Sequence, residues 1–469
     1  MSAVDLAPDA TVFALRPGRG TLALHATGFR HPRTRWPFGE QFTAYTDVTH
    51  LQLGMRALRI GTRQGVQILP RSHFVDREAP EALVRALLDR ILREPSGAAQ
   101  LARMAEADEA FRQPAPLTAT WAAVLVCLAA FAAEFALGPV VHHAGFMNPE
   151  LAARGEPWRL VTANFLHAGP THLALNALGL FVFGALVERP LGALRTIFIL
   201  GLSGLGSMAT AWIAGYEELV GASGLVAGLA GAALWLELRR PECLPALWRV
   251  PRRLLIGVFL AQALLDRLLP FVAGAAHIGG FAAGALAAAL CTGPHLRRDP
   301  LRPSLAVASA LVVAIAAASV ASAVRFLVAP SAWEGHAARL LTLDRPPALL
   351  MNDAAWLIAT ARTPSRKALD EALELADRAA RATGHRDPNV LDTLAEAQFR
   401  GGDAPAALST IDEAIALAPD QSYFREQRRR FAGERAADDR PTPPSEVEPV
   451  PEPMPDREAP HSEDPGISI

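Results

Sequence analysis

Hydrophobic residues in this chain gather into long runs from Leu117 onward, after a first part in which they alternate with polar residues. A helix needs about 20 mostly apolar residues to cross a bilayer. We predict seven such spans, at residues 117–137, 168–187, 193–215, 219–238, 253–272, 276–293 and 304–328. The 469 residues are 51% hydrophobic, and the mean hydropathy is positive. The sequence therefore predicts a mainly α-helical, polytopic membrane protein.

Residues 1–95 alternate short β-rich runs with Gly and Pro turns, which predicts a small sheet. The runs are residues 11–15, 21–26, 42–45, 57–60 and 66–69. An amphipathic helix follows Pro80, with Leu83, Leu87 and Ile91 on one face. Several strands closed by one helix resemble the pleckstrin-homology-like fold. A soluble domain without a ligand is the alternative, and residues 96–116 are predicted to be a linker.

The part of the chain after the last span divides into helical hairpins and a polar tail. Residues 351–432 resemble tetratricopeptide repeats, with apolar positions that predict two hairpins: Trp356, Ala372 and Ala376, then Leu391, Leu394, Ala407, Ile411, Ala414 and Pro419. About three repeats are usually needed for stability, so a protein partner or another copy is expected to support this pair. The acidic, Pro-rich residues 433–469 are predicted to be disordered.

Charged residues between the spans predict the orientation in the membrane. Three of the loops carry ten Arg in all, at positions 189, 195, 239, 240, 249, 252, 253, 297, 298 and 302. The loop with Glu217 and Glu218 has no basic residue. Basic loops stay in the cytoplasm, which predicts a cytoplasmic N-terminus and, after seven spans, a C-terminus outside. The start of the chain shows no cleavable signal peptide. We expect an integral protein of the bacterial inner membrane.

Composition excludes several other classes of function. A net charge of -2 gives no surplus of basic residues for binding nucleic acid. Two of the three cysteines lie inside apolar spans, so no disulfide framework is indicated. No metal site and no organic cofactor are expected.

Two helix starts carry the candidate chemistry. Ser223 lies between Gly221 and Gly224 at the start of the fourth span, and His277 lies at the start of the sixth. Under the predicted orientation both enter from the outer face, at a similar depth. Polar groups at that depth are costly unless they face water or a partner. Small residues that serve only close helix packing are the alternative for the fourth span.

A third polar group opens the second span. His172 and Asn176 are four residues apart, so they share one helix face and could donate hydrogen bonds to a developing oxyanion. The alternative is a polar pair that only packs helices. Gly224 and Gly228, facing Gly280 and Gly284, would let the fourth and sixth spans approach closely.

These motifs, in this order, resemble the rhomboid family of intramembrane serine proteases over about residues 117–293. They are Trp158-Arg159, then His167, His172 and Asn176, then Gly221, Ser223 and Gly224, and last His277 with Gly280 and Gly284. The span at 304–328 would make a six-plus-one bundle.

The resemblance implies a Ser–His dyad without an acid, with Ser223 as nucleophile and His277 as general base and acid. The oxyanion would bind His172, Asn176 and the backbone N–H of Ser223. Trp158, Arg159, His167 and Glu188 would be scaffolding. Ala227 stands where rhomboids often have a Tyr that stacks on the imidazole, so His277 must be oriented in another way.

The predicted function is therefore cleavage of transmembrane or membrane-proximal peptide bonds near the outer face. The expected partners are transmembrane protein substrates and the lipid bilayer. A non-proteolytic rhomboid-like adaptor that binds transmembrane helices is the alternative. A transporter or channel is a weaker third reading, because the spans hold few ionisable groups beyond Asp266 and Arg267.

Overall fold

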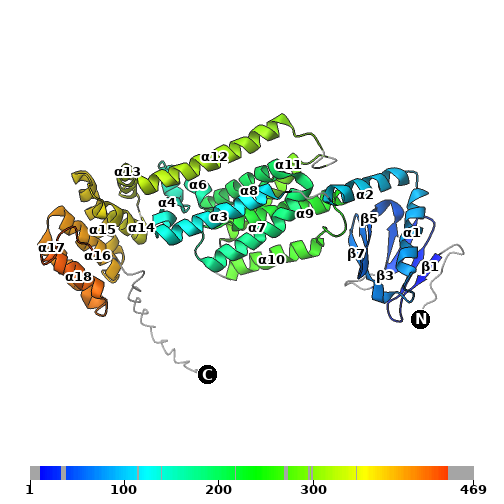
Figure 1. Ribbon diagram of the computed structural model, residues 1–469, viewed down its shortest axis with the longest axis horizontal. Coiled ribbons are helices and arrows are strands. Elements are labelled where there is room, and N and C mark those ends of the chain that lie inside the picture. Colours follow the sequence, from blue (N-terminus) through cyan, green and yellow to red (C-terminus); the bar gives the residue numbers. More distant parts are fainter. Residues whose placement is uncertain are drawn as a thin grey trace, which may run out of the picture. The chain divides into compact units, whose positions relative to one another are not determined.

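A computed structural model describes most of the chain as two compact units, Met1–Ala323 and Val324–Ile469 (Figure 1). The described residues are 11–32, 39–112, 116–138, 140–216, 218–268, 273–293, 296, 299–344 and 346–441. Of the tail predicted at residues 433–469, residues 442–469 lie outside the described residues. Residues 433–441 are described, and there Arg440 Nη2 donates to Glu396 Oε1 at 2.7 Å. This first part of the predicted tail therefore packs against the helices before it.

The first unit begins with two antiparallel sheets and a helix. The four-stranded sheet has the order β1-β2-β3-β4, and the three-stranded sheet has the order β5-β6-β7. Their bounds are β1 Thr11–Ala14, β2 Thr21–Leu24, β3 Gly28–Pro32, β4 Glu40–Ala44, β5 Val48–Leu53, β6 Ala57–Thr62 and β7 Gly65–Pro70. Strands β3 and β5 were not predicted, because His, Arg and Gln interrupt their apolar pattern.

Helix α1 (Ala79–Leu92) buries Leu83, Leu87 and Ile91, the face that the sequence predicts. These residues join one hydrophobic core with both sheets. Several strands followed by one helix is also the order on which the pleckstrin-homology-like expectation rests. That assignment stays a prediction.

The segment predicted as a linker, residues 96–116, contains a helix instead. Helix α2 (Gly97–Arg112) adds Met104 to the core of the β-rich part. Buried Gln100 donates to the carbonyl oxygens of Tyr45 at 2.8 Å and Val48 at 2.6 Å. The sequence did not predict this helix, because its apolar residues do not form one continuous face. A few contacts, such as those of Gln100 and Met104, hold it against the β-rich part.

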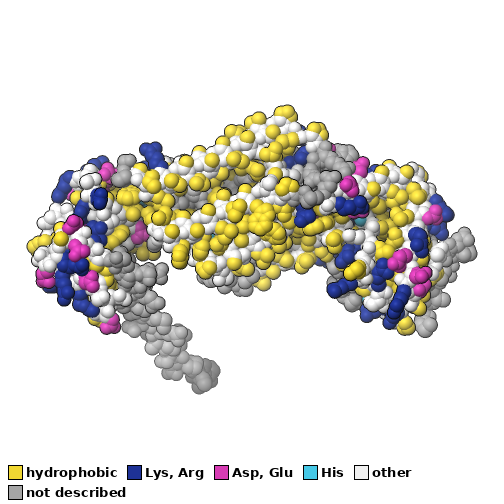
Figure 2. All heavy atoms as spheres, in the orientation of Figure 1, with side chains coloured by type: hydrophobic (Ala, Val, Ile, Leu, Met, Phe, Trp, Pro, Cys, Tyr) yellow, Lys and Arg dark blue, Asp and Glu magenta, His cyan; other side chains and the backbone are white. Residues whose placement is uncertain are grey.

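Five helices are long and apolar enough to cross a membrane among the described residues. They are α3 (Thr118–Leu137), α7 (Pro170–Leu191), α8 (Ala193–Ile213), α11 (Gly274–Cys291) and α12 (Pro303–Val328). Figure 2 shows hydrophobic side chains over the visible face of this bundle. The chain is therefore a multi-pass membrane protein. The orientation of its ends stays a prediction.

The fourth predicted span is a shorter helix, and the described part of the fifth has the same length. Helices α9 (Ser223–Arg239) and α10 (Arg252–Leu268) have 17 residues each in the described part of the chain. A 17-residue helix is about 25 Å long, less than the roughly 30 Å of bilayer hydrocarbon. Helix α9 contacts α7, α8 and α11, so protein surrounds much of it.

Short elements connect these helices. They are η1 (Tyr45–Asp47), η2 (Arg71–His73), α4 (Val140–Gly145), α5 (Pro149–Ala153), α6 (Arg159–Thr162) and η3 (Pro241–Cys243). Helix α12 packs on α8, where Ser309 Oγ donates to Leu194 O at 2.9 Å.

The second unit is helical throughout its described residues. It contains α13 (Pro330–Leu340), α14 (Ala348–Thr360), α15 (Arg366–Ala382), α16 (Pro388–Gly401), α17 (Ala404–Leu417) and α18 (Ser422–Phe431). Helices α14 to α17 occupy the range of the two predicted hairpins, and Ala372, Leu391 and Ile411 are buried. The repeat assignment and its protein partner stay predictions.

Candidate active site

Helices α9 and α11 meet backbone to backbone at glycines spaced four residues apart. A Cβ atom at Gly280 would lie 2.3 Å from the carbonyl oxygen of Gly224. One at Gly284 would lie 2.1 Å from the carbonyl oxygen of Gly228. These distances are far inside van der Waals contact, so a side chain would force the two helices apart. The glycines thus set the distance between the starts of the two helices.

Ser223 and His277 face each other at those two starts. Ser223 is the first residue of α9 and half-buried, and His277 is buried in the first turn of α11. The Ser223 Oγ atom lies 2.8 Å from His277 Nε2. The hydroxyl donates to this nitrogen when the nitrogen carries no proton. A serine held in this way by an imidazole can pass its proton to the ring while its oxygen attacks an electrophile.

Polar groups from α7 converge on the space beside Ser223. Gly221 has φ +126°, a conformation that favours glycine, and a Cβ atom there would lie 2.8 Å from His172 Nε2. The same atom would lie 3.5 Å from Asn176 Nδ2. Glycine therefore lets the His172 ring and the Asn176 amide lie directly against the chain two residues before Ser223. The buried Asn176 Nδ2 has no hydrogen-bond partner among the described residues. An unsatisfied buried donor is rare and is available to an incoming acceptor.

Two backbone contacts fix the loop that leads into α9. Met147 and Leu219 exchange hydrogen bonds of 3.0 and 3.2 Å, and Gly221 N donates to Ala163 O at 2.9 Å. The segments that hold the loop precede α7 in the chain. The position of Ser223 thus depends on contacts with residues more than 50 positions earlier.

Trp158 and Arg159 fasten the connection between α3 and α7. Trp158 Nε1 donates to Ala144 O at 3.0 Å. Arg159 is fully buried, and its Nε donates to Glu156 Oε2 at 2.6 Å. Its Nη1 donates to the carbonyl oxygens of His143 at 2.7 Å and Phe146 at 3.1 Å. Both side chains bind backbone of the connection before α7, and the scaffolding role stays a prediction. Sequence reasoning missed Glu156, although its i, i+3 spacing from Arg159 was a usable signal.

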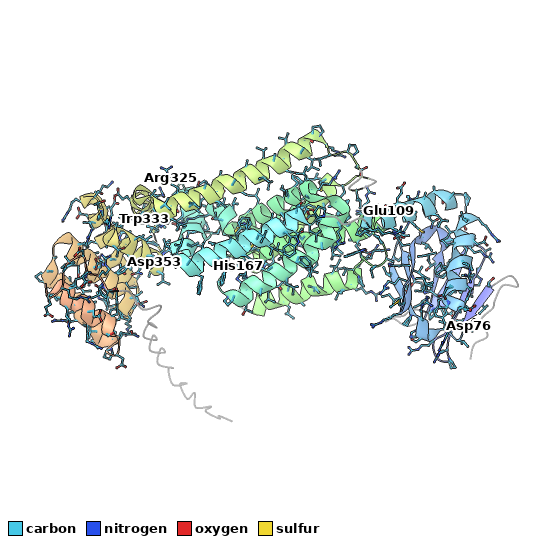
Figure 3. The ribbon with its side chains drawn as sticks, viewed as in Figure 1. Asp76, Glu109, His167, Arg325, Trp333 and Asp353 are labelled. Carbon is cyan, nitrogen blue, oxygen red and sulfur yellow. The ribbon has the colours of Figure 1, made fainter. Side chains whose placement is uncertain are left out.

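His167 and Glu188 both contact other side chains or backbone of the bundle. Figure 3 labels His167, which precedes α7; its ring meets that of His172 edge to face at 5.2 Å. Glu188 caps α3, because its carboxylate accepts from the backbone N–H groups of Ala119 at 2.9 Å and Thr120 at 2.8 Å. His167 thus supports the His172 ring, and Glu188 ties α7 to the start of α3.

His142 was not singled out in the sequence, yet it joins two segments beside the site. Its Nδ1 lies 3.3 Å from Glu134 Oε1 at the end of α3, and its Nε2 lies 3.0 Å from Glu218 Oε1 in the loop before α9. Residues eight and 76 positions away in the chain cannot be paired from periodicity alone. The protonated imidazole therefore links α3 to the loop that carries the chain into Ser223.

We expect Gly280→Ala to destabilise the bundle by about 3 kcal/mol or more, because its methyl group would overlap the Gly224 carbonyl. Gly257→Ala on α10 is the matched control, since a Cβ atom there meets nothing within 4 Å. Equilibrium unfolding in mixed micelles measures both variants. Equal unfolding free energies for the two would contradict the close approach of α9 and α11.

The link through His142 predicts a loss of stability at alkaline pH. Burial lowers the pKa of His142, but hydrogen bonds to Glu134 and Glu218 outweigh it and raise the pKa to about 9. A pKa raised on folding stabilises the protein fully below about 6.5, and this contribution disappears as the pH rises through about 9. The shift corresponds to at most about 3 kcal/mol. The native chain should have a higher unfolding free energy than His142→Gln at pH 7, and this difference should largely disappear at pH 10. A difference of the same size at pH 7 and at pH 10 would contradict the link.

Comparison with known proteins matches residues 154–294 to the Rhomboid domain. The putative rhomboid protease YdcA of Bacillus subtilis (strain 168) is 33% identical over 148 residues, covering 31% of this chain and 73% of YdcA. Rhomboid protease AarA of Providencia stuartii is 31% identical over 159 residues, covering 29% of this chain and 57% of AarA. RHOMBOID-like protein 6, mitochondrial, of Arabidopsis thaliana is 37% identical over 138 residues, covering 28% and 42%.

The chain thus spans almost three quarters of YdcA and about half of the other two relatives. The matched domain includes α7, α9 and α11, which carry Asn176, Ser223 and His277. Together with the multi-pass helical bundle, the identity to YdcA over most of that protein establishes that this chain belongs to the rhomboid family.

Proposed function

We infer that this rhomboid-family chain is an intramembrane serine endopeptidase, which cleaves transmembrane or membrane-proximal peptide bonds of protein substrates. The observation that carries this inference is the 2.8 Å contact between Ser223 Oγ and His277 Nε2 at the starts of two glycine-packed helices. Relatives that are named rhomboid proteases support it. Endopeptidase chemistry also needs donors for a negatively charged oxygen, and Asn176 and His172 lie beside this pair.

The proposed reaction proceeds through an acyl-enzyme. Ser223 Oγ attacks the carbonyl carbon of the scissile bond, and His277 Nε2 takes the hydroxyl proton. The carbonyl oxygen becomes an oxyanion, which the Asn176 amide, the His172 ring and the backbone N–H of Ser223 stabilise. His277 then gives the proton to the leaving amine as the C–N bond breaks. Water attacks the ester, His277 takes a proton from it, and Ser223 regains that proton as the acid product leaves.

The decisive test is Ser223→Ala in the purified full-length chain with a labelled transmembrane substrate. We expect a loss of at least a thousandfold in cleavage rate, because the nucleophile is removed. Reaction of the native chain with a fluorophosphonate, followed by peptide mapping, should place the label on Ser223. Ser322→Ala is the control, since the exposed Ser322 hydroxyl bonds only within its own helix.

His277→Ala should match Ser223→Ala, and the double variant should be no slower, because the two residues act as one unit. Cleavage by folded Ser223→Ala within tenfold of the native rate would contradict the endopeptidase proposal. Intact binding of transmembrane helices by that variant would then favour the rhomboid-like adaptor.

We expect Asn176→Ala to lower kcat about a hundredfold and to leave KM nearly unchanged, since an oxyanion donor acts mainly in the transition state. The free protein should lose little stability, because the Asn176 Nδ2 atom makes no hydrogen bond to any described residue that the substitution would remove. Steady-state kinetics and thermal unfolding of the same preparation measure both. A raised KM at constant kcat would make Asn176 a substrate-binding residue instead.

A further inference from the structure

Arg249 forms a buried ion pair with the helix that carries Ser223. It lies between η3 and α10, and its side chain is fully buried, as is nearly all of the Glu237 side chain on α9. Arg249 Nε donates to the two carboxylate oxygens of Glu237 at 2.9 and 3.1 Å, and Nη2 donates to Oε1 at 2.6 Å. This paired geometry is the strongest that a guanidinium and a carboxylate can form.

The remaining nitrogen of the same guanidinium binds the β-rich N-terminal part of the chain. Arg249 Nη1 donates to Thr49 Oγ1 of β5 at 3.1 Å and to the carbonyl oxygen of Thr62 at the end of β6 at 2.7 Å. Both threonines are buried. Arg252 adds a parallel link, since its Nη2 donates to the carbonyl oxygens of Glu237 and Arg63. Two arginines thus join the sheet β5-β6-β7 to the last turns of α9.

The charges at this junction favour the pairing of Glu237 with Arg249 and Arg252. His50 follows Thr49, and burial together with the nearby Arg249 lowers the pKa of His50 to about 4, so its ring stays neutral. Glu237 therefore has two arginine partners and no competing cation from β5. A buried ion pair adds little stability over an apolar core, but losing one partner leaves a costly unpaired charge. This pair therefore holds the sheet and helix in one register.

Helix α9 can carry this constraint to the reacting pair. Fourteen residues separate Ser223 from Glu237 in one continuous helix, a distance of about 21 Å. The backbone of α9 lies against that of α11 at Gly280 and Gly284, without side chains that could adjust. A small axial shift or rotation of α9 at Glu237 therefore changes the distance between Ser223 Oγ and His277 Nε2.

We propose that Arg249 is a positioning residue for the reaction, and that through it the N-terminal β-rich domain sets the alignment of Ser223 with His277. The inference rests on the proposed endopeptidase function for its kinetic consequence. The structural link itself does not depend on that function. In this proposal the β-rich domain supports the C-terminal end of α9, the helix that carries Ser223.

Three graded variants of the full-length chain test this. Arg249→Met removes every bond that Arg249 makes at the junction and leaves the parallel link through Arg252. Arg249→Lys keeps the charge, but one ammonium cannot reproduce the fork that serves both Glu237 and the sheet. Thr49→Val keeps the shape and removes one of the two bonds from Arg249 to the sheet, while the bond to the carbonyl oxygen of Thr62 remains. The exposed side chain of Arg63 takes no part in the link, so Arg63→Met is the matched control on the same sheet.

We expect kcat per folded molecule to fall about threefold in Thr49→Val and about tenfold in Arg249→Lys, with KM within twofold, because misalignment acts on the chemical step. The rate of fluorophosphonate labelling at Ser223 should fall in the same order. A merely structural role would lower the folded fraction and leave kcat per folded molecule unchanged. Values for both variants within 1.5-fold of Arg63→Met would overturn the proposal.

Hydrogen exchange separates failure of this proposal from failure of the proposed function. Exchange at the amides of the first turn of α9 should rise in Thr49→Val and Arg249→Lys and not in Arg63→Met, whether or not the chain cleaves a peptide bond. An increase confined to the Glu237 end would overturn the inference, even if the native chain is active. A native chain that neither cleaves substrate nor labels Ser223 would instead refute the endopeptidase function alone.

Discussion

The structure of the site depends on the direct backbone contact between α9 and α11. Gly280 lies against Gly224, and Gly284 lies against Gly228, with no room for a Cβ atom between them. In a bilayer, apolar side chains gain little from leaving lipid for protein, so close backbone packing holds such helices together. Because the contact lies just beyond the helix starts, it also brings Ser223 and His277 within hydrogen-bond distance. Packing and chemistry here have the same cause.

The glycine contact does not fix the loops or the far end of α9. Polar interactions between segments distant in the chain hold these parts in place. Arg159 and Glu156 secure the connection before α7, and Met147 pairs with the loop before Ser223. At the opposite end of α9, Arg249 joins Glu237 to the N-terminal sheet. Helix α9 is thus fixed at both ends by residues outside the bundle's apolar core. A 17-residue helix that is shorter than the bilayer needs such support at its ends.

The sequence was enough to identify the features that depend on local spacing. The four-residue spacing of the glycines, the His172–Asn176 face and each apolar run can be recognised within a short stretch of sequence. The Arg249 link was not, because Arg249 and Thr49 are 200 residues apart and neither belongs to a repeating pattern. Helix α2 was missed for a related reason: Gln100 bonds to backbone carbonyls, and backbone partners leave no trace in a sequence. Pattern analysis thus finds faces and periods, whereas single polar contacts between distant segments need coordinates.

The unpaired donor of Asn176 has a consequence for how this protein can evolve. The buried Asn176 Nδ2 atom has no hydrogen-bond partner among the described residues, so the free protein carries the desolvation cost of this donor. An apolar residue at position 176 would remove this desolvation penalty without giving up a hydrogen bond from Nδ2 to any described residue. Selection for heat resistance alone would therefore favour such a replacement of Asn176, at the expense of the proposed reaction. Laboratory screens for hardier variants of this fold need a simultaneous demand for turnover, or they will enrich well-folded proteins that have lost their chemistry.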